Sequence, residues 1–170
     1  MPADFEAVVD RCQSNVYTYA CHLLRDPAAA EDLTQEVFLR LWRHWQRIDV
    51  ARVDAWLTRV TRNLCYDKWR LERTARQYLV PPLPGEVEAA VDATPGPQQH
   101  AEATDFRQRF EAAVAKLSEP ARSALILREV LGYKYREIAD ALELPLNTVR
   151  VYLHRGRKKL RLELADAADD

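Results

Sequence analysis

Apolar residues recur at every third or fourth position along most of the chain, which is the spacing of amphipathic helices. No segment shows the alternation of apolar and polar residues that marks a half-buried strand. The helical spacing is lost over 77–104, where five of the nine prolines lie. The pattern predicts an all-α protein with a small helical domain over 1–76, a flexible Pro-rich acidic linker over 77–104, and a second helical domain over 105–170.

The second domain has the spacing of a helix-turn-helix. A short helix is predicted over 135–142, and Pro145 ends it while fitting the first turn of a second helix. Many such turns carry a glycine where this chain has Glu143, so the geometry of the turn stays open. The segment 117–131 supplies a supporting helix. The second helix turns these residues inward: Val149, Tyr152, Leu153, Gly156 and Leu160.

The opposite face of that second helix has the chemistry of a DNA-contacting surface. The amide of Asn147 is able to pair with adenine, the guanidinium of Arg150 with guanine, and Val151 is able to touch a thymine methyl group. The alternative is an ordinary solvated basic helix. The same outward face also includes His154 and Lys158. The residues expected to lie near phosphates are Lys134, Tyr135, Arg136, Arg155, Arg157, Lys158, Lys159 and Arg161.

Two helices stand out in the first domain. The first is predicted over 31–48, with an apolar stripe of Leu33, Val37, Leu41, Trp45 and Ile48 toward a core. Its other side presents a leucine among acids and amides, which is typical of a protein-docking face. The equal alternative is a solvated helix start, where acids favour the helix dipole. The residues on this side are Asp32, Gln35, Glu36, Leu39 and Arg43.

The second of these helices is predicted over 54–76, with Leu57, Val60, Leu64 and Leu71 facing inward. Its outer side interleaves basic groups with aromatic rings, a combination that fits single-stranded nucleic acid. A purely structural alternative places both tryptophans in the core. The outer set is Arg59, Arg62, Asn63, Tyr66, Arg70 and Arg73, with Trp56 and Trp69 at its edges.

Charge and cysteine content narrow the class of protein. The net charge is only −1, but 77–104 holds acids and no Lys or Arg, so the flanking segments are locally basic and nucleic acid remains a possible partner. The three cysteines fit no zinc spacing, and we expect Cys12, Cys21 and Cys65 to be reduced, buried or half-buried side chains. The absence of a long apolar run or targeting segment favours a cytoplasmic protein without membrane insertion.

Catalytic chemistry is not indicated by the sequence. An enzyme acting on nucleic acid needs a carboxylate cluster, a metal site or a nucleophile–base pair. The histidines at 22, 44, 100 and 154 lie in separate contexts without such companions. We therefore expect a protein that is not an enzyme, with no cofactor, no metal and no small-molecule substrate.

Three blocks of sequence, taken in order, resemble the extracytoplasmic-function (ECF) group of alternative bacterial sigma factors. They are AEDLTQEVFLRLWRHW, AWLTRVTRNLCYDKWR and LSEPARSALILREVLGYKYREIADALELPLNTVRVYLHRGRKKL. The resemblance covers nearly the whole chain, and the order, the spacing and the two-domain size all fit. It implies a subunit that binds core RNA polymerase and directs initiation at specific promoters.

The resemblance also assigns a role to each surface. The docking face (Asp32, Gln35, Glu36, Leu39 and Arg43) would bind the clamp helices of the largest polymerase subunit, and the polymerase flap is a further expected contact. The −10 face (Trp56, Arg59, Arg62, Asn63, Tyr66, Arg70 and Arg73) would hold the melted non-template strand, with a flipped base in a loop for which 49–54 is one candidate. The −35 face (Lys134, Tyr135, Asn147, Thr148, Arg150, Val151, His154, Arg155 and Lys158) would contact duplex DNA.

The family implies regulation from outside, typically by an anti-sigma factor that covers the same faces. A rival hypothesis is a stand-alone repressor or activator that uses only 117–161, and this predicts a dimer on a symmetric operator. Whether the free protein holds its two domains apart or together is left open by the sequence.

Overall fold

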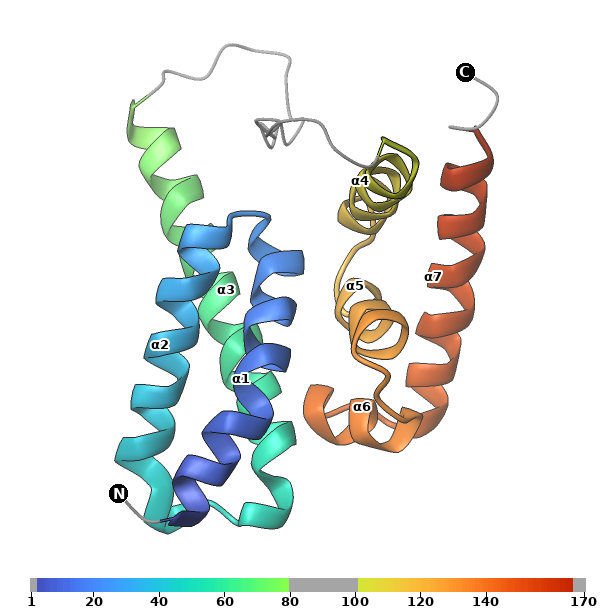
Figure 1. Cartoon of the computed structure of the whole chain (residues 1–170). Coiled ribbons are helices and arrows are strands. Elements are labelled where there is room, and N and C mark those ends of the chain that lie inside the picture. Colours follow the sequence, from blue (N-terminus) through green and yellow to red (C-terminus); the bar gives the residue numbers. More distant parts are fainter. Residues whose placement is uncertain (1–2, 80–100, 167–170) are drawn as a thin grey trace.

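The computed structural model describes residues 3–79 and 101–166, and all regular structure within them is helical, as predicted (Figure 1). The N-terminal domain contains α1 (Ala3–Leu24), α2 (Pro27–His44), the 3₁₀ turns η1 (Trp45–Arg47) and η2 (Val50–Arg52), and α3 (Val53–Leu79). The C-terminal domain contains α4 (Ala101–Ala115), α5 (Ala121–Leu125), the π-helical turn η3 (Ile126–Val130), α6 (Tyr135–Leu142) and α7 (Leu146–Asp166). The central part of the predicted linker lies outside the described residues.

The N-terminal domain is a bundle of α1, α2 and α3 (Figure 1). The predicted helix restart at Pro27 is confirmed, because Asp26 accepts a hydrogen bond from the backbone N–H of Ala29 at 3.0 Å and Pro27 occupies the first turn. The helix predicted over 31–48 ends at His44 and continues as a 3₁₀ turn. Its apolar stripe faces the core as predicted, with Leu33, Val37 and Leu41 buried and Trp45 and Ile48 partly buried.

The long helix α3 has one inward prediction that is wrong. Leu57 is buried, but Leu71 is 72% exposed. The last turns of α3 project beyond the other helices of the bundle (Figure 1), and within the described part of the chain its apolar stripe is uncovered at Leu71. A helical period therefore identified the face correctly but not the length over which that face is covered.

The C-terminal domain contains the predicted helix-turn-helix. The observed bounds of α6 agree with the predicted 135–142, and α7 follows directly after Pro145. Val149 and Leu153 are fully buried against the supporting segment, in which α5 passes into η3. None of the described helices combines the length and the apolarity that crossing a bilayer requires.

The two domains lie side by side and contact each other through α1, α3, α5, η3 and α6 (Figure 1). Their buried apolar residues form one continuous cluster. Polar contacts join them as well. The Tyr19 hydroxyl lies 2.7 Å from the Ser123 hydroxyl, and the Thr58 and Tyr133 hydroxyls lie 3.4 Å apart. The sequence left open whether the two domains lie apart or together, and the structure places them in contact.

Candidate nucleic-acid and polymerase interfaces

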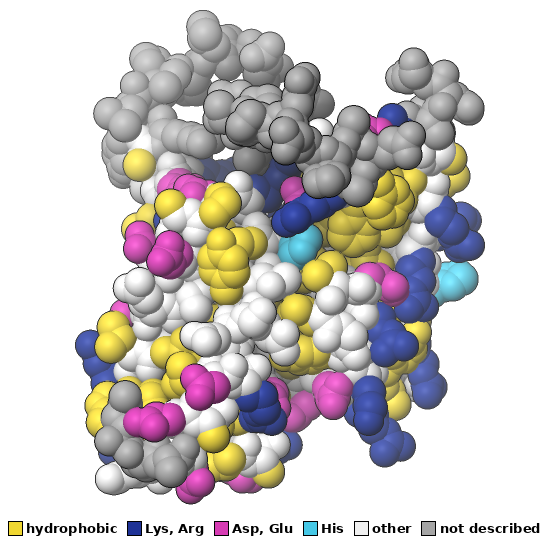
Figure 2. Space-filling model, in the orientation of Figure 1, with side chains coloured by type: hydrophobic (Ala, Val, Ile, Leu, Met, Phe, Trp, Pro, Cys, Tyr) yellow, Lys and Arg dark blue, Asp and Glu magenta, His cyan; other side chains and the backbone are white. Residues whose placement is uncertain are grey.

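The outer face of α7 is solvent-exposed along its length. Lys and Arg side chains gather over this helix in the space-filling view (Figure 2). Asn147, Arg150 and His154 are exposed, and Val151 is 46% exposed. Arg150 Nη1 donates a hydrogen bond to Asn147 Oδ1 at 3.1 Å, so the two side chains are already aligned on one face. Side chains whose chemistry is able to hydrogen-bond base edges therefore lie together on an exposed face of α7.

Not every basic residue of α7 is available to phosphates. Arg157 Nε donates to Glu129 Oε1 at 2.7 Å, and its Nη1 donates to the Tyr135 hydroxyl at 3.1 Å. These bonds, chiefly the one to Glu129, raise the pKa of Arg157. Sequence reasoning grouped Arg157 with the phosphate-contacting residues, whereas the structure ties it to η3 and α6. Lys134 is exposed and Tyr135 is half-buried.

The turn between α6 and α7 uses Glu143 where the sequence pattern suggested a glycine. Glu143 is left-handed, with φ 56° and ψ 42°, and the backbone N–H of Leu144 donates to the carbonyl of Ala139 at 3.0 Å. A left-handed residue at this position lets backbone N–H groups pair with the last carbonyls of α6 while the chain turns away from the helix. The turn therefore has the usual geometry despite the unusual residue.

The docking face lies on α2 as predicted, with Asp32, Gln35 and Arg43 exposed and Leu39 51% exposed. Glu36 is half-buried, and its hydrogen bond from Arg40 Nε at 2.7 Å lowers its pKa. Beside this face lies a groove of about 700 Å³ between α1 and α2. The side chains that line it are Phe5, Glu6, Val9, Asp10, Gln35, Phe38, Leu39 and Trp42. The α1 wall of this groove was not found from the sequence.

The −10 face of α3 is only partly open. Asn63, Arg70 and Arg73 are exposed, but Trp56, Arg59, Arg62 and Tyr66 are half-buried. The C-terminal domain covers this part of α3, and it also supplies Arg122, whose guanidinium stacks over the Trp69 ring at 5.4 Å. The structure thus brings the predicted −10 residues onto one helix and divides them into a covered group and an open group.

A cavity of about 400 Å³ lies at the N-terminal end of the −10 face, between the 3₁₀ turns and α3. It includes Asp49 and Arg52 from the segment 49–54. The remaining lining residues are His44, Arg47, Ile48, Ala55, Trp56, Arg59 and, from the other domain, Asp140.

Comparison with known proteins identifies the family of each domain. Residues 8–75 match the family model described as sigma-70 region 2, and residues 107–160 match that described as sigma-70, region 4. The chain is a member of the ECF group of sigma-70 factors. Region 2 coincides with α1–α3 and region 4 with the helix-turn-helix domain.

Individual sigma factors align along most of this chain. The ECF RNA polymerase sigma factor SigE of Mycolicibacterium smegmatis is 33% identical over 97% of this chain. The chain spans only 63% of the length of that relative. SigX of Bacillus subtilis is 26% identical over 95% of the chain and 84% of its own length. The fold is similar to that of the sigma factor RpoE in its complex with the anti-sigma factor NepR from Bartonella quintana, with a TM-score of 0.72, 24% identity, and 95% and 97% of the two chains covered.

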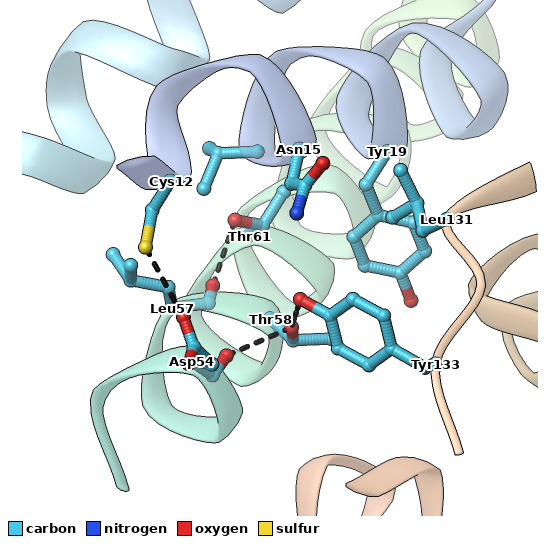
Figure 3. Close-up of a pocket in the computed structure, with 10 residues that line it drawn as sticks. Cys12, Asn15, Tyr19, Asp54, Leu57, Thr58, Thr61, Leu131 and Tyr133 are labelled. Carbon is cyan, nitrogen blue, oxygen red and sulfur yellow. Dashed lines mark hydrogen bonds between the residues drawn. The ribbon is translucent and has the colours of Figure 1, made fainter. Parts of the chain in front are cut away.

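A small cavity lies where α1 and α3 meet the segment between η3 and α6 (Figure 3). Cys12 Sγ donates to Asp54 Oδ1 at 3.1 Å, and the Thr58 hydroxyl donates to the Asp54 carbonyl at 2.9 Å. Burial, followed by the neighbouring Asp54 carboxylate, raises the pKa of Cys12 to about 12. Burial likewise raises the pKa of Cys65 to about 12, so both thiols stay protonated at neutral pH. The prediction of buried or half-buried cysteines is confirmed for Cys12, Cys21 and Cys65.

Proposed function

We propose that this sigma-70 chain binds core RNA polymerase and directs it to promoters that it recognises through two DNA elements. The observation that carries the proposal is the pairing of an exposed α7 face with an exposed α2 face on a chain that matches sigma regions 2 and 4 in order. A stand-alone regulator has use for the first face but not for the second.

The −35 element would be bound as duplex DNA by the −35 face. The exposed pair Asn147–Arg150 and the apolar Val151 supply base contacts, while Arg155 and Lys158 lie where they reach phosphates. The hydrogen bond between Asn147 and Arg150 already restricts both side chains before DNA binds. Each side chain therefore loses less conformational entropy on contact with the DNA.

The −10 element would be bound as a melted strand along the −10 face. Basic groups follow the backbone of a single strand and aromatic rings stack on its bases. The cavity of about 400 Å³ beside Trp56 and Arg52 is the proposed place for an unstacked base, because a ring, a guanidinium and the Asp49 carboxylate surround it. This proposal extends the candidate loop 49–54 to the adjoining residues His44 and Arg47.

Polymerase docking would use the docking face together with the groove beside it. The groove joins apolar rings to the acids Glu6 and Asp10, so it fits an amphipathic helix with basic flanks. Regulation by an anti-sigma factor that covers these faces is part of the same proposal, and the similarity to an anti-sigma-bound sigma factor supports it.

The decisive experiment mixes the purified chain with bacterial core RNA polymerase. Co-elution and selective initiation from a promoter library are the expected results, and the selected promoters would give both DNA elements. Duplex binding without association would place the chain among stand-alone regulators and contradict the proposal.

A further inference from the structure

One guanidinium on α7 connects three elements of the C-terminal domain. All three nitrogens of Arg157 are engaged: Nε and Nη2 lie 2.7 and 2.6 Å from Glu129 Oε1, and Nη1 donates to the Tyr135 hydroxyl at 3.1 Å. Glu129 belongs to η3, and Tyr135 is the first residue of α6. A planar guanidinium fixes the direction of its hydrogen bonds as well as their length. Arg157 therefore links α7 to η3 and α6 in a defined orientation.

The side chain of Tyr135 is held from two sides by neighbouring residues of η3. The Arg128 guanidinium stacks over the Tyr135 ring at 5.4 Å and donates through Nη1 to the Tyr133 carbonyl at 2.9 Å. Glu129, the next residue, holds Arg157 against the Tyr135 hydroxyl. Because this hydroxyl accepts from Arg157, its own hydrogen is directed away from that guanidinium and is able to donate to a DNA phosphate.

The π-helical turn η3 brings Arg128 and Glu129 into these positions. The backbone N–H of Leu131 donates to the carbonyl of Ile126 at 3.2 Å, across five residues rather than four. Ile126 and Leu127 are fully buried and anchor the turn. One extra residue rotates the side chains around it by about 100° relative to an uninterrupted α-helix. Such turns are uncommon and often occur at functional sites, so the placement of these two side chains depends on a specific local irregularity.

Arg157 lies where it is able to set the rotation of α7 about its own axis. It follows Arg150 by seven residues, so the two side chains lie on nearly one line along the helix, roughly 10 Å apart. At Gly156 the helix packs closely, since a Cβ atom there would lie 3.4 Å from Leu125 Cδ1, but glycine has no side chain to interlock with a groove. A rotation of about 20° would move the tip of Arg150 by roughly 2 Å, which is more than a hydrogen bond tolerates.

The same contacts contribute little to the stability of the fold. The side chains of Arg157 and Glu129 are 39% and 36% exposed. Ion pairs with this exposure are screened by water and are individually weak. Breaking the pair should therefore alter the orientation of α7 more than it alters the free energy of unfolding. This difference separates a positioning role from a merely structural one.

We propose that Arg157 is a positioning residue for the −35 element: held by Glu129, it sets the rotation of α7 and the orientation of Tyr135 without contacting DNA itself. The inference rests on the proposed binding of the −35 element by α7. The rival hypothesis is that Arg157 leaves Glu129 and binds a phosphate, in which case it contributes equally on every DNA sequence.

The test uses the full-length variants Arg157→Lys and Glu129→Gln. Lysine keeps the positive charge but lacks the fork that joins Glu129 to Tyr135. The measured quantity is selectivity: initiation with core polymerase at a promoter selected by the wild type, divided by initiation at the same promoter with a substituted −35 element. We expect both variants to lose roughly tenfold in this ratio, with melting temperatures close to that of the wild type. Duplex binding to the two −35 sequences should show the same loss of selectivity.

The matched control is Glu163→Gln. It also removes an acid of the C-terminal domain, one that pairs α7 with Lys116. Glu163 lies 13 residues after Arg150, about 20 Å along the helix, so its loss should leave selectivity unchanged.

The rival hypothesis predicts a different pattern. Arg157→Lys would keep the selectivity of the wild type, and Glu129→Gln would strengthen binding to every duplex and steepen its salt dependence, because it frees Arg157 for a phosphate. That pattern would overturn the positioning role. So would an equal fall in the Glu163→Gln control, or an equal loss on both promoters together with a lower melting temperature.

Failure of the inference is distinguishable from failure of the proposed function. If the wild type initiates selectively and both variants are equally selective, only the positioning role is wrong. If the wild type does not initiate at any promoter with core polymerase, the proposed function is wrong and the inference falls with it.

Discussion

At the scale of single residues, Glu143 serves two structural purposes. Its backbone closes the turn in a left-handed conformation, and its side-chain carboxylate reaches Arg59 in the other domain. Replacing it with glycine should increase the free energy of unfolding by roughly 0.5–1 kcal/mol, because the conformational gain exceeds the value of one exposed ion pair. Urea unfolding of wild type and Glu143→Gly measures this difference, and a loss of stability would mean that the Arg59 pair dominates.

Arg150 is the residue on which sequence-specific contact with the −35 element should depend most. Its guanidinium is exposed and aligned with Asn147. Arg150→Ala should cost about 1–3 kcal/mol of binding to the preferred duplex and much less on other sequences. Arg161→Ala is the control, because a phosphate contact is lost on every sequence alike. Competition binding with specific and random duplexes checks both, and an equal loss on all DNA would assign Arg150 to phosphates alone.

At the scale of elements, α2 separates its stabilising stripe from its proposed docking face. Leu41 is fully buried, whereas Leu39 is 51% exposed and Asp32 is exposed. The double variant Asp32→Ala/Leu39→Ala should therefore fold normally and lose roughly tenfold or more in affinity for core polymerase. Co-elution and circular dichroism are the measurements. Leu71→Ala removes a comparable exposed leucine from α3 and should leave affinity unchanged; equal affinity of the double variant would contradict the docking assignment.

At the scale of the whole molecule, the contact between the domains contains a buried carboxyl group. Burial raises the pKa of Glu119, while Ser123, Arg122 and, across the domains, Arg62 act in the opposite direction. Tyr19 of α1 and Cys65 of α3 also face this group. The contact between the domains therefore includes polar and ionisable groups beside its apolar cluster.

Glu119 makes the free energy of unfolding depend on pH in a defined direction. Because its pKa is raised on folding, the folded state binds the proton more tightly, and stability falls as pH rises from the ordinary glutamate value through the raised one. Glu119→Gln should remove this dependence and increase stability at neutral pH. The difference in urea midpoint between wild type and variant, measured between about pH 4 and pH 7, checks the prediction. A constant difference across this range would mean that Glu119 keeps an ordinary pKa.

The packing of the two domains against each other also limits how the molecule is able to bind a promoter. The proposed binding faces for the two DNA elements lie on separate domains, and α6 covers part of the −10 face. The domains must then separate for both faces to contact DNA together. The segment between Leu79 and Ala101 has the sequence length to reach across such a separation.

The sequence by itself determined the helices, their inward faces and the chemistry of the outward ones. The bounds of α6, the burial of Val149 and Leu153, and the exposure of Arg150 all follow from a 3.6-residue period, which is a local property of the chain. The family resemblance then connected these faces to a function, which no periodicity supplies.

Only the tertiary structure decided which surfaces are covered. Leu71 is exposed because α3 extends beyond the neighbouring helices of its bundle. Arg157 is paired with Glu129, and Arg59 is paired with Asp140 and Glu143. Each of these outcomes joins residues that are far apart in the sequence or depends on where a neighbouring helix ends. Such pairings follow from the shape and charge of whole elements, so they are fixed when the domains pack and not by the local pattern of apolar and polar residues.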